Sequence, residues 1–450
     1  MTRRKTLNTA LILAFVASSA QAADLMTAWQ SAQSRDPEIA AARALFEQAD
    51  FRKSQAQALW KPQVMAGGAV GLGGQDSQTK GASAFGNVGD FNTNTNMGVL
   101  ARANLSAQKA WISPEREAQS KQLELSAQIA EVQWQQAQQG LIMRTAQKYF
   151  DVLGAELTLD IVLRQQKAVQ AAAAEINKRQ RVGDASVMDV QEANARVSDI
   201  RAQVLTLENN LAMKLVAYRQ LVGQEPKQLA SLTSSDQLTP TSLADATVWV
   251  QRAKEKSPAL QMMGLQQNIQ AQEAKRIQAG NATTLNWVAQ AQMDRLTGRG
   301  MYGSSSNQMA QYMVGLQLNA PLSTGGMVES RELEALKQVE KLRFDQEAAS
   351  LQVESQVRDA WQNIHSASAR LQALEASNKT SHARLRATRD AHRTGARTTN
   401  EWLGAENDAA QAELAVVQLR IQTVMERLRL HAASGELGET QLKDINALLR

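Results

Sequence analysis

Four short segments of this 450-residue chain alternate apolar and polar side chains at every second position. These segments are 63–72, 96–105, 284–294 and 311–320. In the first, Val64 to Leu72 share one parity, and in the last, Tyr312 to Ala320 do so. A period of two is typical of strands with one apolar face, and about ten residues is the length of a strand that crosses a membrane. We therefore predict two pairs of membrane strands.

Polar segments and aromatic residues surround these strands. Residues 73–95 and 298–308 are rich in Gly, Asn and Ser, and we expect them to be loops outside the cell. Five aromatic residues lie at or near predicted strand ends, where the lipid–water interface favours them: Trp60, Trp111, Trp287, Tyr302 and Tyr312. A soluble antiparallel sheet with one wet face is the alternative, but its apolar face would need a covering helix, and the helices are committed elsewhere.

Helical patterns fill the rest of the chain. They extend over about 25–60, 113–180, 186–222, 246–280, 327–392 and 398–434. The 113–180 helix would be ~100 Å long at about 1.5 Å rise per residue. Few globular helices approach that length, so we expect a coiled-coil partner along its whole course.

The chain repeats its own layout. Pro37 recurs as Pro258, 221 residues later, and Leu105-Ser106 recurs as Leu322-Ser323 after 217. Gly183 and Gly223 recur as Gly395 and Gly435, both after 212. Four matches in the same order indicate a duplicated unit. We predict a first repeat over 23–223 with its strand pair at 63–107, and a second over 246–435 with its strand pair at 284–322. Segments 224–245 and 436–450 lie outside the repeats.

The N-terminal segment has the features of a secretory signal. Arg3, Arg4 and Lys5 precede an apolar stretch, and Ala20-Gln21-Ala22 fits a cleavage site, so we predict removal of 1–22. Without these three cations, 46 Lys and Arg face 44 Asp and Glu, a net charge of about +2 that gives no support for nucleic-acid binding. The chain has no cysteine, which excludes a disulfide framework and a cysteine-linked lipid anchor.

The predicted strands constrain how this chain enters a membrane. No stretch after the signal approaches 18 apolar residues, so we predict strands rather than helices in the membrane. Four strands cannot close a barrel, and open strand edges are not tolerated in lipid. Several copies must then share one barrel. Two would give eight strands with a filled interior, and three would give twelve with an open lumen.

Two turn motifs carry a resemblance that covers essentially the whole mature chain. They read Val182-Gly183-Asp184-Ala185-Ser186-Val187-Met188-Asp189-Val190 and Thr394-Gly395-Ala396-Arg397-Thr398-Thr399-Asn400-Glu401-Trp402-Leu403. With the doubled order of helices and strand pairs, the chain resembles the TolC family of outer-membrane efflux and secretion proteins. Thr394 replaces the usual Val of the pattern.

The resemblance implies an α+β membrane protein. Three copies would build a twelve-stranded β-barrel, four strands per protomer, in outer-membrane lipid, continued by a long α-helical barrel across the periplasm. Segments 224–245 and 436–450 would form a belt around it. A periplasmic adaptor protein and an inner-membrane transporter, driven by ATP or by protons, would dock at the periplasmic tip and open a passive exit duct for efflux or type I secretion.

The family's gate residues carry over by position. Asp189 and Arg397 match the acid and base that link neighbouring helices in the closed tip, and His392 lies where a tyrosine latch is found. Gly183 and Gly395 mark the tip turns. Glu401 matches the outer acidic ring of the entrance. The second acid of the family is Gly404 here, so a single ring would remain.

Catalytic chemistry has no signature in this sequence. The four histidines show no metal-binding spacing, Gly71-Leu72-Gly73-Gly74 lacks the Lys of a phosphate loop, and no Gly-x-Ser-x-Gly elbow occurs, so we predict no catalytic residue, metal or cofactor. The alternatives are a periplasmic adaptor or structural coiled-coil protein without a channel, and a general diffusion porin, which would have more strands and fewer helices.

Overall fold

The computed structural model describes residues 24–84, 87–226, 229–232, 238, 243–300 and 303–449. The predicted signal at 1–22 and Tyr302 lie outside these ranges. The chain forms two compact units. The first comprises the chain up to Ala42, Gln135–Ser257 and the chain from Ser350, and the second comprises Arg43–Trp134 and Pro258–Ala349.

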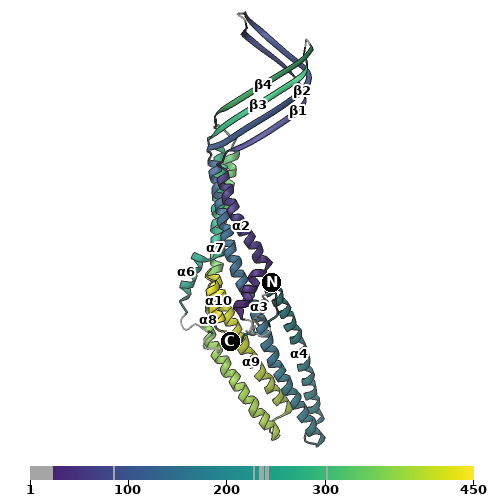
Figure 1. Cartoon of the computed structure of the whole chain (residues 1–450). Helices are drawn as coiled ribbons and strands as arrows, with labels where there is room; N and C mark the ends of the chain where they lie inside the picture. The colour runs from purple at the N-terminus through teal and green to yellow at the C-terminus, as the bar shows by residue number, and fades with distance from the viewer. Residues whose placement is uncertain are drawn as a thin grey trace, which may run out of the picture. The chain divides into compact units, whose positions relative to one another are not determined.

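A four-stranded antiparallel sheet belongs to the second unit (Figure 1). Its strands, in spatial order, are β1 Gln63–Ala84, β2 Asn87–Ile112, β3 Thr284–Gly300 and β4 Gly303–Asn319. The pairing of β2 with β3 joins the two halves of the sequence repeat. Ala66 pairs with Leu105, Leu105 with Ala291, and Ala291 with Tyr312. The positions predicted to be apolar are therefore in register across all four strands.

The strands are longer than the ten residues predicted. They have 22, 26, 17 and 17 residues, and the segments 73–95 and 298–308, predicted as loops, continue both hairpins over their described residues. The prediction failed there because it relied on apolar alternation. Hydrogen bonds between strands come from the backbone, so a hairpin that is exposed to solvent on both faces can form without an apolar face. Tyr312 consequently lies in the middle of β4 rather than near its end.

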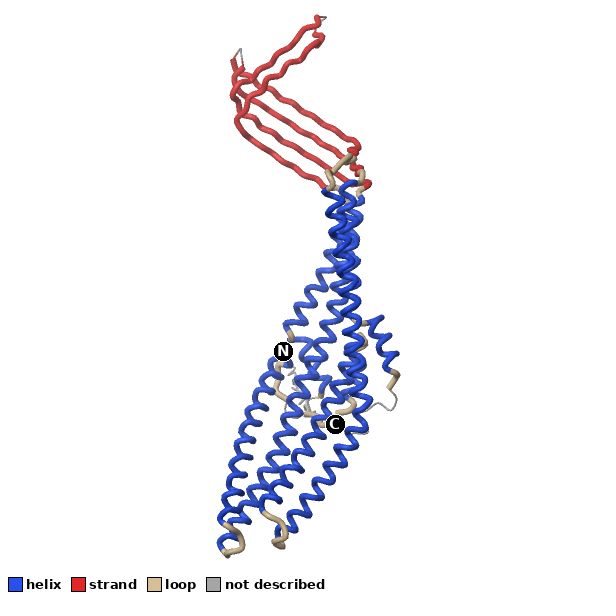
Figure 2. The backbone as a smooth tube through the Cα atoms, turned by 180° about the vertical axis from the view of Figure 1, so that it is seen from behind, coloured by secondary structure: helices blue, strands red, loops and turns tan. Residues whose placement is uncertain are grey.

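Long helices make up most of the remaining chain, as Figure 2 shows in blue. They are α1 Leu25–Arg35, α2 Pro37–Ala58, α3 Pro114–Arg181, α4 Val187–Val222, α6 Ala246–Lys256, α7 Pro258–Gln278, α8 Met327–Arg393, α9 Thr399–Ala433 and α10 Glu439–Asn446. α3 has 68 residues and α8 has 67, which confirms the predicted long helices.

None of the described helices is both long and apolar enough to cross a membrane.

Two predicted helices, 25–60 and 246–280, are each divided in two before a proline. Asp36 ends α1 with ψ 117° and Ser257 ends α6 with ψ 121°. A residue that precedes proline is pushed from the helical into the extended region, which explains both breaks. Gly435, with φ +74°, lies against the second break, since a Cβ there would be 2.2 Å from the Lys256 carbonyl oxygen. Its repeat partner Gly223, with φ +84°, lies against Arg35 beside the first.

The core of the first unit includes residues from the two segments outside the repeats, 224–245 and 436–450. Tyr149 of α3 and Tyr218 of α4 are fully buried, and α1, α9 and α10 contribute to the same cluster. The Tyr149 hydroxyl accepts a hydrogen bond from the Ala230 backbone N–H at 3.1 Å. Leu232 and Leu449 form a β-bridge. Described residues of 224–245 and 436–450 thus pack together.

Candidate functional site: the sheet faces and the helical turns

One face of the sheet is apolar and exposed. Tyr312 is 89% exposed, and the apolar positions of all four strands share this face: Val64, Val70, Leu72, Val99, Leu105, Trp287, Met293, Val314, Leu316 and Leu318. On β3 the apolar run from Leu285 to Met293 covers nine residues before Arg295. A continuous exposed apolar face marks a membrane or protein contact, and nine to eleven residues is the length of a membrane strand.

Two tryptophans lie at the helix-proximal end of this apolar face. Trp111 of β2 and Trp287 of β3 are stacked, with ring centroids 6.4 Å apart, and both are exposed. Indole rings with one wet and one apolar side are favoured at a membrane interface. Their position agrees with the predicted aromatic girdle at this end of the strands.

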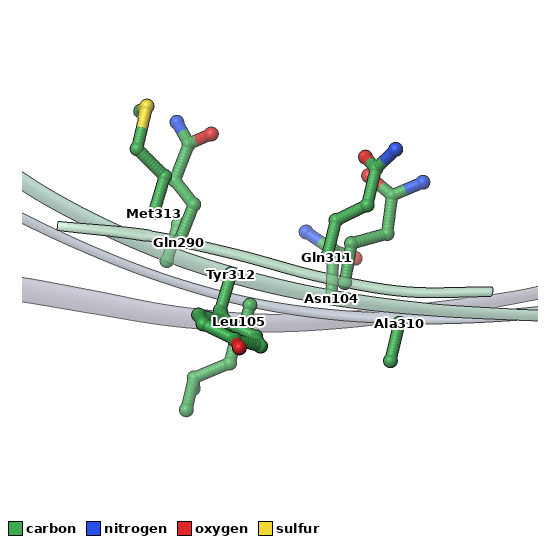
Figure 3. A pocket seen from close by; sticks show the side chains of 10 residues that line it. Asn104, Leu105, Gln290, Ala310, Gln311, Tyr312 and Met313 are labelled. Atoms are coloured by element: carbon green, nitrogen blue, oxygen red, sulfur yellow. The ribbon is translucent and has the colours of Figure 1, made fainter.

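The opposite face of the sheet is rich in amides. Figure 3 shows the side chains of Asn104, Gln290, Gln311 and Met313 on one side of the strands, with Leu105, Ala310 and Tyr312 on the other. Asn104 pairs with Gln292, which pairs with Gln311, so three amides lie side by side across β2, β3 and β4. The sheet therefore has one face suited to lipid and one suited to water.

Two helical turns of the first unit, α3–α4 and α8–α9, share one construction. Gly183 and Gly395 have φ of +85° and +76°, which glycine adopts without strain. Past each glycine, a backbone N–H reaches back five residues: Asp184 N–H donates to the Arg179 carbonyl at 2.8 Å, and Ala396 N–H donates to the Ala391 carbonyl at 2.9 Å. This pattern closes a helix C-terminus and reverses the chain.

Capping boxes start both following helices. Ser186 and Asp189 cap α4, and Thr398 and Glu401 cap α9. Asp189 and Glu401 are equivalent by the 212-residue repeat, and each carboxylate accepts a hydrogen bond from the backbone N–H of its cap residue. These bonds hold the pKa of both carboxyl groups below their usual range, Asp189 through Ser186 and Glu401 through Thr398 and Arg397.

Arg397 pairs with Glu401 within the same chain. Its Nη1 lies 2.5 Å from Glu401 Oε1, and the two side chains are 57% and 42% exposed. The sequence predicted a partnership with Asp189 across neighbouring helices. Among the described residues of one chain, the structure brings Arg397 to Glu401 instead, and a contact with Asp189 of another copy stays a prediction.

His392 is buried at the meeting point of the two turns. It is 5% exposed, its ring lies 4.9 Å from that of Trp402, and its Nε2 is 3.3 Å from Thr399 Oγ1. Burial lowers the pKa of His392 first, and the nearby Arg179 cation lowers it further, against the acids Glu175 and Asp189. This side chain therefore favours the neutral form where it is packed.

The structure brings His392 together with Asp189, and it adds partners that the sequence analysis did not single out. Trp402 and Leu403 of α9 pack with Ile176 of α3 and Ala193 of α4 in one apolar cluster. The spacing Ser-x-x-Asp at 186–189 and Thr-x-x-Glu at 398–401 is a readable capping signature. Trp402, by contrast, has no local signal, because its burial depends on three other helices.

Comparisons with known proteins agree on one kind of molecule. The sequence profile described as "Outer membrane efflux protein" matches residues 28–224 and 249–436. Outer membrane protein TolC of Vibrio cholerae is 24% identical over 447 residues, which are 97% of this chain and 96% of that protein. Proteases secretion protein PrtF of Dickeya chrysanthemi is 23% identical over 465 residues, with 99% and 95% covered. The crystal structure of VceC from V. cholerae superposes with a TM-score of 0.73 at 17% identity, covering 91% of this chain and 96% of that one.

Proposed function

The chain belongs to the outer membrane efflux protein family, and on this premise we propose that three copies close one twelve-stranded barrel and form the exit duct of a tripartite export system. The protein is an outer-membrane channel that extends into the periplasm. The proposed duct is a passive conduit, and its partners supply the energy of transport.

The observation that supports shared closure is the exposed apolar face of a sheet with two free edges. Within the described sheet, β1 and β4 each have a single neighbouring strand. Free edges are not tolerated in lipid, so both must be paired. β1 and β4 run in opposite directions, so β4 of one copy can continue the antiparallel ladder with β1 of the next. Such head-to-tail contacts close into a ring. Three copies leave an open lumen, whereas two would fill it with side chains.

The α3–α4 and α8–α9 turns are proposed to form the periplasmic gate. Asp189, Arg397 and His392 would hold the closed arrangement, and Glu401 would line the entrance once in each copy. Capping boxes hold the start of the helix after each turn, so opening would move helix pairs as bodies rather than unwind them. A periplasmic adaptor and an inner-membrane transporter would dock here and supply the energy of opening.

Purified protein reconstituted in a planar lipid bilayer tests the channel directly. We expect discrete, ohmic current steps of one dominant size, because a barrel of fixed strand number has a fixed lumen. Protein that binds the bilayer without any current steps would refute a channel.

The cargo is tested separately, with a deletion strain. PrtF is named for the secretion of proteases, so we propose export of proteins, and small toxic compounds are the second candidate. Loss of one or a few large proteins from the medium, with unchanged tolerance to dyes, bile salts and antibiotics, would support secretion. Sensitisation with an unchanged set of secreted proteins would instead establish efflux.

A further inference from the structure

Over 63–73, 98–108, 286–296 and 307–317, the amide-rich face of the sheet contains a single pair of charged residues. This face comprises alternate positions over 63–73 of β1, 98–108 of β2, 286–296 of β3 and 307–317 of β4. In these described stretches, the charged residues on this face are Arg102 and Asp294. The remaining positions hold amides, methionines, small residues and a few aliphatic side chains. A water-facing surface of this size with one cation and one anion is electrically neutral.

Arg102 and Asp294 are bound to each other. They are direct cross-strand partners in the ladder between β2 and β3. Arg102 Nε donates to Asp294 Oδ1 at 2.8 Å, and Gln292 Nε2 donates to Asp294 Oδ2 at 2.8 Å. Each charge therefore has its opposite charge at hydrogen-bond distance, and the Gln292 amide helps to orient Asp294.

The pair is open to solvent on the amide-rich face. Its side chains are 49% and 22% exposed for Arg102 and Asp294. Both line a hollow of about 230 Å³ together with Leu100, Leu296 and Asn307. Asn307 Nδ2 also donates to Gln75 Oε1 at 3.4 Å, so β1 reaches across to β4 beside this hollow. Ions in the hollow would therefore meet the pair directly.

We propose that Arg102 and Asp294 cancel each other's charge and thereby keep the sheet segment of the duct unselective between cations and anions. This inference rests on the proposed barrel, in which the apolar face points to lipid and the amide-rich face lines the lumen. Rings of charged side chains control which ions pass a pore, and a narrow lumen focuses their field. With both partners present, the segment discriminates neither sign of charge, which suits a duct for bulky cargo of mixed charge.

Loss of one partner would expose its counterpart in every copy. In Arg102→Gln, each Asp294 keeps its charge, and three copies place three anions in the lumen. In Asp294→Asn, three Arg102 cations remain. An alternative role for the pair is to fix the register between β2 and β3, since opposite charges across a ladder stabilise the pairing. That role alone predicts less stable barrels with unchanged selectivity.

The test is the reversal potential of single channels under a KCl gradient. Arg102→Gln is expected to raise the K⁺ to Cl⁻ permeability ratio at least about twofold, and Asp294→Asn to lower it by a similar factor. The double variant Arg102→Gln/Asp294→Asn should return to the native ratio. Arg295→Gln is the matched control, because Arg295 follows Asp294 on β3 and points to the opposite face.

The outcomes separate the two claims. Native protein that conducts, with the same permeability ratio in all three variants, would overturn the selectivity role and leave the channel intact. A shift in Arg295→Gln as large as in Arg102→Gln would also overturn it. Native protein without current would refute the proposed function itself. Conducting variants with opposite shifts that cancel in the double variant would establish the assignment.

Discussion

Arg397 is the residue whose role depends most on other copies of the chain. Its partner within one chain is Glu401, one helical turn away and exposed to solvent. Screened surface pairs of this kind add little to stability. If Arg397 matters to the closed gate, the reason must be a contact made in the assembly.

Arg397→Ser is therefore expected to increase single-channel current without lowering the thermal unfolding midpoint. In the proposed closed gate the variant would lose a charge-assisted hydrogen bond between helices, whereas each chain loses only an exposed pair. Arg393→Ser is the matched control, because Arg393 is also an exposed arginine beside the same turn. Equal currents from native protein and Arg397→Ser would remove Arg397 from the gate.

If the proposed gate includes His392, its opening should depend on pH. The folded-state pKa of His392 lies below the ordinary value of 6.5, so the proton binds less well in the packed state than in an opened one. The packing contribution is then complete above pH 6.5 and is lost as the pH falls through the lowered folded pKa. Asp189 and Glu401, whose pKa values are lowered from below 5, stay charged in this window. Glu406 of α9 has the opposite effect on the packed state. Burial raises its pKa, so its protonation as the pH falls favours the packed state.

We expect the current of native channels to rise between pH 7.5 and pH 5.5, and to change little over this range in His392→Gln. His382→Gln controls for loss of a histidine from the same helix. A rise of equal size in His392→Gln would show that other groups carry the response.

At this scale the sequence predicted positions better than contacts. Asp189 and Glu401 lie in the two turn motifs, and their capping bonds follow from a local spacing. The choice of His392 as a latch came from the family resemblance and stays a prediction. The contact of Trp402 with His392, whose ring centroids lie 4.9 Å apart, depends on which helices meet, and no local pattern carries that information. The pairing of Arg397 with Glu401 is a local contact between residues four positions apart, whereas the family resemblance implied a partner on a neighbouring helix.

Among the elements, the helices and the apolar face of each strand were predictable because both follow periodic patterns. α3, α4, α8 and α9 begin and end within one residue of their predicted bounds. The hairpin extensions were missed because apolar alternation stops where both faces of a hairpin are wet. The breaks at Asp36 and Ser257 show that a proline inside a helical pattern divides the element.

Replacing the glycines of the repeat by alanine separates two costs, the strain of a positive φ and the steric overlap of an added Cβ. Gly183→Ala is expected to cost about 1 kcal/mol, because φ is positive and no atom lies within 4 Å of the added Cβ. Gly435→Ala should cost roughly 1–3 kcal/mol more, since the Cβ would overlap the Lys256 carbonyl and force the chain apart. Thermal unfolding followed by circular dichroism compares the two. A smaller loss for Gly435→Ala would contradict the packing described at the second break.

At the scale of the whole molecule, the proposed channel depends on shared closure of the barrel. The chain supplies four strands, an apolar face and two free edges, and each property needs other copies to be satisfied in lipid. Sequence reasoning reached this point by counting strands. It could not choose three copies over two without the family resemblance, because the interface lies between chains.

Cysteine cross-linking between β1 and β4 tests that closure most directly, and the native chain has no cysteine to interfere. One cysteine replaces Val70 in β1, and a second is scanned over the outward positions 310–318 of β4 in outer membranes. The control carries cysteines at Ala103 and Met293, which are direct partners in one chain and should bond within it. We expect the matching β1–β4 pair to give covalent dimers and trimers, and nothing larger. Cross-linked products that stop at dimers, that extend beyond trimers, or that are absent at every position would contradict a barrel closed by three copies.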